Sequence, residues 1–175
     1  MRLVKLLTCG VLLAPGYALA DPAYTVEVSH SYVPVKGIER LAVMPITCPK
    51  TLECEKLTAQ VTKGLSHGTK MAVATPQWTS QVMAKAGIDK LDFETGYILA
   101  EALSVDAFSV VDIQEAAMDD KEVKHVKISL KIVSKNGDNL LVANGEGQVK
   151  GMFTSIDEVA VLTWEAMMQR SMPKN

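Results

Sequence analysis

The stretch that decides the fold is VKHVKISLKIVSKNGDNLLVANGEGQV, residues 123–149. In its first half, apolar side chains from Val126 to Ile132 alternate with lysine and serine, which predicts a β-strand with one buried and one wet face. Asn136-Gly137-Asp138 predicts a turn, and residues 140–149 predict the returning strand. We therefore expect an antiparallel hairpin in the second half of the chain.

The segments upstream of this hairpin alternate between strands and helices. Continuous apolar runs predict a strand over residues 40–46 and a second buried strand over 71–74, and a third strand spans 107–113. Helical spacing and capping residues predict helices over residues 52–65 (with Gly68 just beyond), 76–86 and 92–103. A last helix is predicted to begin within residues 154–158 and to run to about residue 172. After an N-terminal arm the order is β-α-β-α-α-β-β-β-α, which predicts an α/β fold: a mixed β-sheet with helices packed on it.

Composition excludes several functional classes. The chain has 175 residues, of which 48% are hydrophobic and 22% charged, so a disordered or fibrous protein is excluded. A net charge of −2 lacks the basic excess of a nucleic-acid binder. With aromatic residues at 5%, a stacking platform for sugars or bases is not expected.

The first 20 residues have the three parts of a secretory signal peptide. Arg2 and Lys5 form a basic start, residues 6–13 form a short apolar run, and Ala18-Leu19-Ala20 supplies small residues for cleavage before Asp21. The apolar run is shorter than the roughly 20 residues that a transmembrane helix needs. Lipidation at Cys9 is a less favoured alternative, because Thr8 replaces the usual small residue and only eight residues precede it.

The predicted organisation is therefore a signal peptide over residues 1–20, an N-terminal arm or edge strand over 21–37, and a single α/β domain over 38–175. In the arm, apolar residues alternate weakly and Pro34 interrupts them, as in an edge strand. Such an arm can add a strand to a partner's sheet or pair with its own domain. The candidate partner-binding residues are Tyr24, Val26, Val28 and Tyr32.

Two cysteines remain after signal cleavage, Cys48 and Cys54. An even count in an oxidising compartment predicts one disulfide that closes a small loop. A redox-active pair is the alternative, although catalytic pairs usually have two intervening residues and this pair has five.

Three segments resemble a family of bacterial envelope domains that includes CsgG, LpoB and the N-terminal domain of TolB. Residues 38–46, IERLAVMPI, are similar to the first strand of that family. Residues 99–107, LAEALSVDA, are similar to its small-residue helix followed by an L-G-A-D-A strand entry, and residues 133–140, VSKNGDNL, stand at the position of its late hairpin turn. The resemblance implies a periplasmic, non-catalytic domain that binds other envelope proteins. The lipid anchor and the long amphipathic hairpins of CsgG have no counterpart here, so a secretion channel is not expected.

Motifs for enzymatic or metal chemistry are missing from the sequence. His30, His67 and His125 have no metal-ligand spacing, and no nucleophile elbow, phosphate loop or dinucleotide fingerprint occurs. Met167, Met168 and Met172 suggest a copper site, but Val161, Trp164 and Met168 recur at helical spacing, which favours packing for Met168. No cofactor or metal is therefore expected, and the protein is not expected to be an enzyme.

These observations predict a periplasmic protein-binding domain, an adaptor or regulator of a bacterial envelope assembly. Its partner would be an envelope protein, associated with the outer membrane or with peptidoglycan, and an oligomer is compatible with the pattern. Nucleic acid and a transmembrane segment are not expected. The alternative is a periplasmic thiol-redox or metal-binding protein that uses Cys48 and Cys54.

Overall fold

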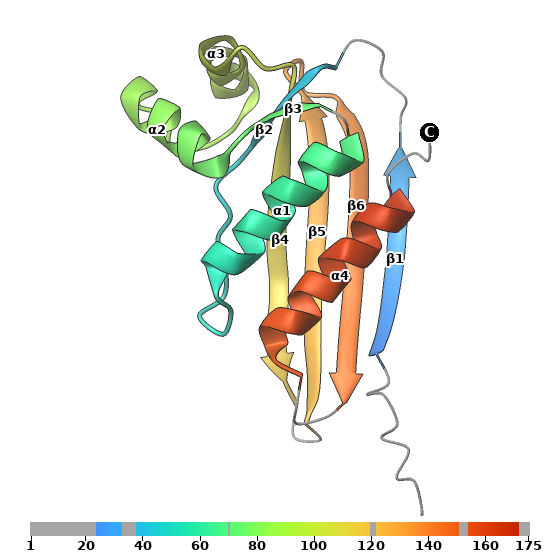
Figure 1. Ribbon diagram of the computed structural model, residues 1–175. Coiled ribbons are helices and arrows are strands. Elements are labelled where there is room, and N and C mark those ends of the chain that lie inside the picture. The colour runs from blue at the N-terminus through green and yellow to red at the C-terminus, as the bar shows by residue number, and fades with distance from the viewer. Residues whose placement is uncertain (1–23, 33–37, 70, 120–121, 151–153, 172–175) are drawn as a thin grey trace, which may run out of the picture.

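The computed structural model describes residues 24–32, 38–69, 71–119, 122–150 and 154–171 (Figure 1). Its centre is one six-stranded mixed sheet in the order β1-β6-β5-β4-β2-β3. The strands are β1 (Tyr24–Tyr32), β2 (Arg40–Val43), β3 (Ala72–Ala74), β4 (Ala107–Met118), β5 (Val123–Ser134) and β6 (Asn139–Lys150). β2 runs parallel to β3 and β4, whereas β4, β5, β6 and β1 are antiparallel to their neighbours. The predicted α/β fold and its element order are confirmed.

Four helices pack on this sheet: α1 (Cys54–Thr69), α2 (Pro76–Ala86), α3 (Phe93–Leu103) and α4 (Ile156–Ser171). Figure 1 shows α1 and α4 side by side across one face of the long strands, with α2 and α3 at the end where β2 and β3 lie. No helix in the described part of the chain is long and apolar enough to cross a membrane.

The core consists of two clusters on opposite faces of the sheet. The larger cluster joins α1 and α4 to the long strands, and its largest fully buried side chains include Trp164, Leu65, Ile128 and Leu130. The smaller cluster places Met83 of α2 and Leu99 of α3 against Phe108 at the start of β4. Because α2 and α3 cover only this end of their face, no helix of the described ranges covers the rest of that face.

Local signals in the sequence account for the helix ends. The Thr75 side chain accepts a hydrogen bond from the Trp78 N–H at the start of α2, and Gly87 ends α2 with a φ of +66°. A capping box begins α3, in which Asp92 and Thr95 exchange hydrogen bonds. The backbone N–H and the hydroxyl group of Thr95 hold the pKa of Asp92 below its ordinary value of 3.8.

Asp106 ties three strands together where they enter the sheet. Its Oδ2 atom accepts hydrogen bonds from the backbone N–H groups of Glu39 (3.0 Å) and Arg40 (3.1 Å), just before and at the start of β2. Its own N–H donates to the carbonyl of Arg40, and its carbonyl accepts from the N–H of Lys135, beyond the end of β5. The aspartate of the L-G-A-D-A-like segment is therefore a structural residue in this chain.

Glycine allows α4 to lie close to β6. A Cβ atom on Gly145 would overlap the Met167 side chain, and one on Gly147 would overlap the Thr163 hydroxyl group. Thr163 is fully buried and donates a 2.6 Å hydrogen bond to the carbonyl of Val159. A larger residue at either glycine would push α4 away from the sheet.

Several element predictions need correction. The strand predicted over residues 40–46 ends at Val43, and the strand predicted over 107–113 continues to Met118. The segment 71–74 was expected to be a buried strand, but β3 is an edge strand in which Ala72 is exposed and Val73 is half-buried, because β2 lies on one side of it only. Gly68 was expected beyond the first helix, but α1 continues to Thr69. A helix can absorb the roughly 1 kcal/mol cost of an internal glycine when its packed face is long enough.

The N-terminal arm pairs with its own domain. All nine residues of β1 lie opposite residues of β6, from Tyr24 opposite Val149 to Tyr32 opposite Leu141. The predicted signal peptide, Cys9 and Pro34 lie outside the described residues, so export and cleavage stay predictions.

Candidate functional site

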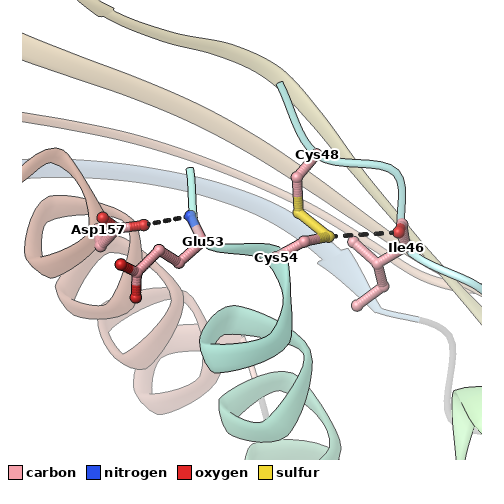
Figure 2. The surroundings of a disulfide bond; sticks show 5 residues. All are labelled: Ile46, Cys48, Glu53, Cys54 and Asp157. Carbon is pink, nitrogen blue, oxygen red and sulfur yellow. Dashed lines mark hydrogen bonds between the residues drawn. A yellow bond between two sulfur atoms is a disulfide. The ribbon is translucent and has the colours of Figure 1, made fainter. Parts of the chain in front are cut away.

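Cys48 and Cys54 are brought together in a disulfide that closes the loop between β2 and α1 (Figure 2). Their Cα atoms are 5.5 Å apart, and Cys54 is the first residue of α1. The Sγ atom of Cys54 lies 3.5 Å from the carbonyl oxygen of Ile46. The pairing anticipated from the cysteine count is therefore present in the structure.

The same loop is fastened to two other elements. The Glu53 N–H donates a 2.7 Å hydrogen bond to Oδ1 of Asp157 in the first turn of α4, as Figure 2 shows. The Thr51 hydroxyl group donates a 2.8 Å hydrogen bond to the carbonyl of Ala116 on β4. The disulfide thus belongs to a network that fixes the start of α1 against the start of α4, which is a structural task.

The histidines predicted to lack metal-ligand spacing lie on separate elements: His30 on β1, His67 in the last turn of α1 and His125 on β5. The Nε2 atom of His125 lies 3.7 Å from Asp119, and Nδ1 of His67 lies 2.8 Å from the carbonyl of Lys63. Among the residues that the structure describes, no group of three or more His, Cys, Asp or Glu side chains is placed to hold a metal ion.

The methionine pair packs in the core. Met167 is fully buried against Gly145, and Met168 lines a hollow of about 480 Å³ between α1 and α4. The floor of this hollow is Trp164, whose indole nitrogen has no hydrogen-bond partner among the described residues and faces Gly64. Packing, which the helical spacing favoured for Met168, accounts for both Met167 and Met168.

A polar surface lies on the face of β1, β4, β5 and β6 that points away from α1 and α4, which we call the open face. The strand registers arrange its side chains in cross-strand rows. One row consists of Asp112, Ser129, Asn144 and Ser29, and the next consists of Glu115, Lys127, Glu146 and Glu27. The sequence indicated a wet face on β5, but the rows depend on strand pairings that it did not specify.

Charge on the open face is only partly balanced. The Lys127 ammonium group lies 3.4 Å from Glu115 and 3.5 Å from Glu146. The hydrogen bond with Glu115 and the charge of Glu146 hold the pKa of Lys127 above its ordinary value of 10.5. Glu27 lies directly opposite Glu146, and like charges in that position oppose strand pairing.

Two hollows adjoin on this face. One, of about 680 Å³, extends from Pro45 and Thr47 across β4 and β5 to Asn144. The other, of about 270 Å³, extends from Gln114 and Asn144 to Glu27 on β1. They share Gln114 and Asn144, so together they form a continuous depression from the disulfide loop to the edge strand.

The residues predicted to contact a partner lie on β1, where Val26 and Val28 are opposite Gly147 and Gly145, the glycines that α4 packs against; they share the α4 face of the sheet, not the open face. β1 carries Tyr24, Val26, Val28 and Tyr32, and Val28 is half-buried against the core. Arg170 of α4 donates a 2.9 Å hydrogen bond to the carbonyl of Val26. Whether these residues bind a partner stays a prediction.

Comparison with known proteins places the fold. No family model matches the chain, and no curated protein matches it. The structure is similar to PelC from Paraburkholderia phytofirmans, crystallised as a dodecamer. The TM-score is 0.59 at 10% identity, over 86% of this chain and 100% of that one.

Two further solved structures are similar at lower scores. Lipoprotein GNA1162 from Neisseria meningitidis has a TM-score of 0.48 at 15% identity, over 66% of this chain and 84% of that one. The LpoB C-terminal domain from Salmonella enterica has a TM-score of 0.45 at 14% identity, over 69% of this chain and 88% of that one. At this identity, the likeness to PelC shows a shared fold.

Proposed function

We propose that this chain is an exported, non-catalytic protein-binding domain that acts as an adaptor or regulator of a bacterial envelope assembly. The observation that carries the proposal is the open face, a broad polar surface with two adjoining hollows. The N-terminal sequence pattern supports export to the periplasm. The fold shared with PelC supports a role in assembly, because that protein is a dodecamer in its crystals.

The chemistry of the open face suits a protein partner. Its charges of both signs are set at fixed strand spacing, with Asp112 and Lys131 exposed on neighbouring strands. Fixed charge patterns of this kind select partners and orient them, which is the usual role of electrostatic complementarity in protein interfaces. The depression continues to β1, so a partner on the open face can also contact Glu27 and Ser29 of the edge strand.

The test is capture of a partner from the periplasm with matched charge variants. Tagged protein is cross-linked in the periplasm and purified as wild type, Lys131→Glu and Lys56→Glu. Lys131 is exposed on the open face, whereas Lys56 is exposed on α1, across the sheet from it. We expect one envelope protein to be recovered with wild type and Lys56→Glu and lost with Lys131→Glu. Recovery that is equal for all three, or no partner at all, would contradict the proposal.

A thiol-redox function is the second candidate, and one observation favours it. Cys54 is the first residue of α1, and a cysteine at a helix N-terminus has a stabilised thiolate. A reduction potential well above the roughly −300 mV of structural disulfides would favour this function. A lower potential would favour the adaptor.

A further inference from the structure

β1 is an edge strand with few of the features that usually prevent edge pairing, although Arg170 of α4 donates a hydrogen bond to the carbonyl of Val26. It is nine residues long, and the described chain provides a neighbour on the β6 side only. Natural edge strands are usually short, bulged, or interrupted by proline or lysine. β1 contains no proline and no lysine, and its register with β6 is regular over all nine pairs. Its outer side can therefore accept another strand.

The opposite edge of the sheet differs. β3 is only three residues long, so it offers little backbone for pairing. The two edges are thus unequal, and strand addition is favoured at β1.

The sequence of β1, YTVEVSHSY, is compatible with pairing to itself. In an antiparallel pair related by a twofold axis through Val28, each residue of one copy lies opposite a residue of the other copy. The two opposed residues are equally far from Val28 in sequence, one before it and one after it. Val28 then faces Val28, Val26 faces His30, and Glu27 faces Ser29. No two like charges lie opposite each other, and all nine residues take part.

Other registers are less favourable. A shift of one residue would place core-facing residues opposite residues of the open face. Moving the axis to Glu27 would place two carboxylates directly opposite each other, and moving it to Ser29 would leave two residues unpaired. The arrangement centred on Val28 is the one that combines full overlap with compatible charge.

We propose that β1 pairs antiparallel with β1 of a second copy of this chain, centred on Val28. The pairing joins two six-stranded sheets into one and places the two open faces side by side. Glu27 and Ser29 of each copy then extend the polar rows of the other. The inference is independent of which envelope protein the domain binds, and it enlarges the surface assigned to that function.

The first test uses opposite charges at Ser29, an exposed residue that faces neutral Asn144 in its own sheet. Ser29→Glu places a second carboxylate opposite Glu27 of the other copy, twice in each dimer, and should weaken association roughly ten-fold. Ser29→Lys places an ammonium group there and should strengthen association several-fold. Sedimentation of the mature protein at low and high salt measures both effects, and the difference should shrink as salt rises. Thermal unfolding of each variant confirms that it is folded.

The second test reports the register directly. Val28→Cys places two thiols on the twofold axis, where opposed Cα atoms are about 4.5–5.5 Å apart, within disulfide range. Val26→Cys is the matched control, because in this register the two Val26 residues are about 13 Å apart along the strands. We expect rapid disulfide-linked dimer from Val28→Cys and little from Val26→Cys.

Any one of three outcomes would overturn the proposal. The wild-type protein could be monomeric at all concentrations, the two cysteine variants could cross-link equally, or the two Ser29 variants could have identical effects. Partner capture with Lys131→Glu and Lys56→Glu is measured separately. If self-pairing is absent but the partner is still captured, the proposed function stands. If self-pairing is present but no partner is captured, only the proposed function is overturned.

Discussion

Gly147 of β6 lies directly beneath Thr163 of α4, so close that a methyl group on the glycine would occupy the position of the threonine hydroxyl group. Thr163 is fully buried and held by Val159, so it has no free space to move into. The distance between α4 and the sheet is therefore set by the absence of a side chain at residue 147.

Gly147→Ala should destabilise the fold. Overpacking a buried contact typically costs about 1–3 kcal/mol, and urea unfolding should show a loss of that size. Gly96→Ala in α3 is the matched control, because its Cβ atom would meet only Leu91 at an ordinary 3.5 Å. That change should stabilise the protein by up to about 1 kcal/mol through helix propensity. Equal losses for both variants would contradict the close-approach account.

Asp106→Ala should loosen the start of β2. The change removes the acceptor for the N–H groups of Glu39 and Arg40, and we expect a loss of about 1–3 kcal/mol in chemical unfolding. Asp106→Asn keeps an oxygen acceptor and should lose less. Hydrogen exchange should increase at these two N–H groups in the alanine variant. Unchanged exchange there would show that the carboxylate does not hold them.

Removing the disulfide should lower stability without preventing folding. The loop it closes is short, so Cys48→Ser with Cys54→Ser should cost about 2 kcal/mol by the chain-entropy estimate. Native mature protein should show no free thiol in a titration, and two thiols after reduction and unfolding. Free thiols in the untreated protein would contradict a structural bridge.

Asp92 should give the stability a dependence on acid pH. The folded-state pKa of Asp92 lies below the ordinary value of 3.8. The stabilisation of the fold by the Asp92 carboxylate is therefore fully present above pH 3.8 and is lost as the pH falls through the lowered folded-state pKa. The melting temperature of wild type should therefore approach that of Asp92→Asn as the pH is lowered from 6 to 2. A constant difference between the two proteins over this range would refute the assignment.

Local signals in the sequence were sufficient to predict the order of the elements. Thr75-Pro76 and Gly87 marked both ends of α2, and Asp92 marked the start of α3, because caps depend on residues within one helical turn. The alternation in residues 123–134 likewise marked the full length of β5. Within the helix predicted over residues 52–65, the buried positions Leu57, Val61 and Leu65 recur every four residues, as the helical period requires.

Long-range relationships could not be predicted in this way. Asp106 binds N–H groups 66 and 67 residues away, and β1 pairs with a strand more than 100 residues later. The alternation of β5 indicated a wet face but did not reveal which residues of β4, β6 and β1 complete the rows of the open face. The role of Gly147 depends on the path of α4, which no local pattern encodes.

The unequal lengths of the two sheet edges limit how the molecule can polymerise. Continuous fibres built by sheet extension need a usable edge on both sides of every subunit, and here β3 offers three residues whereas β1 offers nine. Isologous pairing through β1 uses the same edge on both copies and therefore closes at two. Any larger ring must be built from such pairs through a different surface, so it would contain an even number of chains.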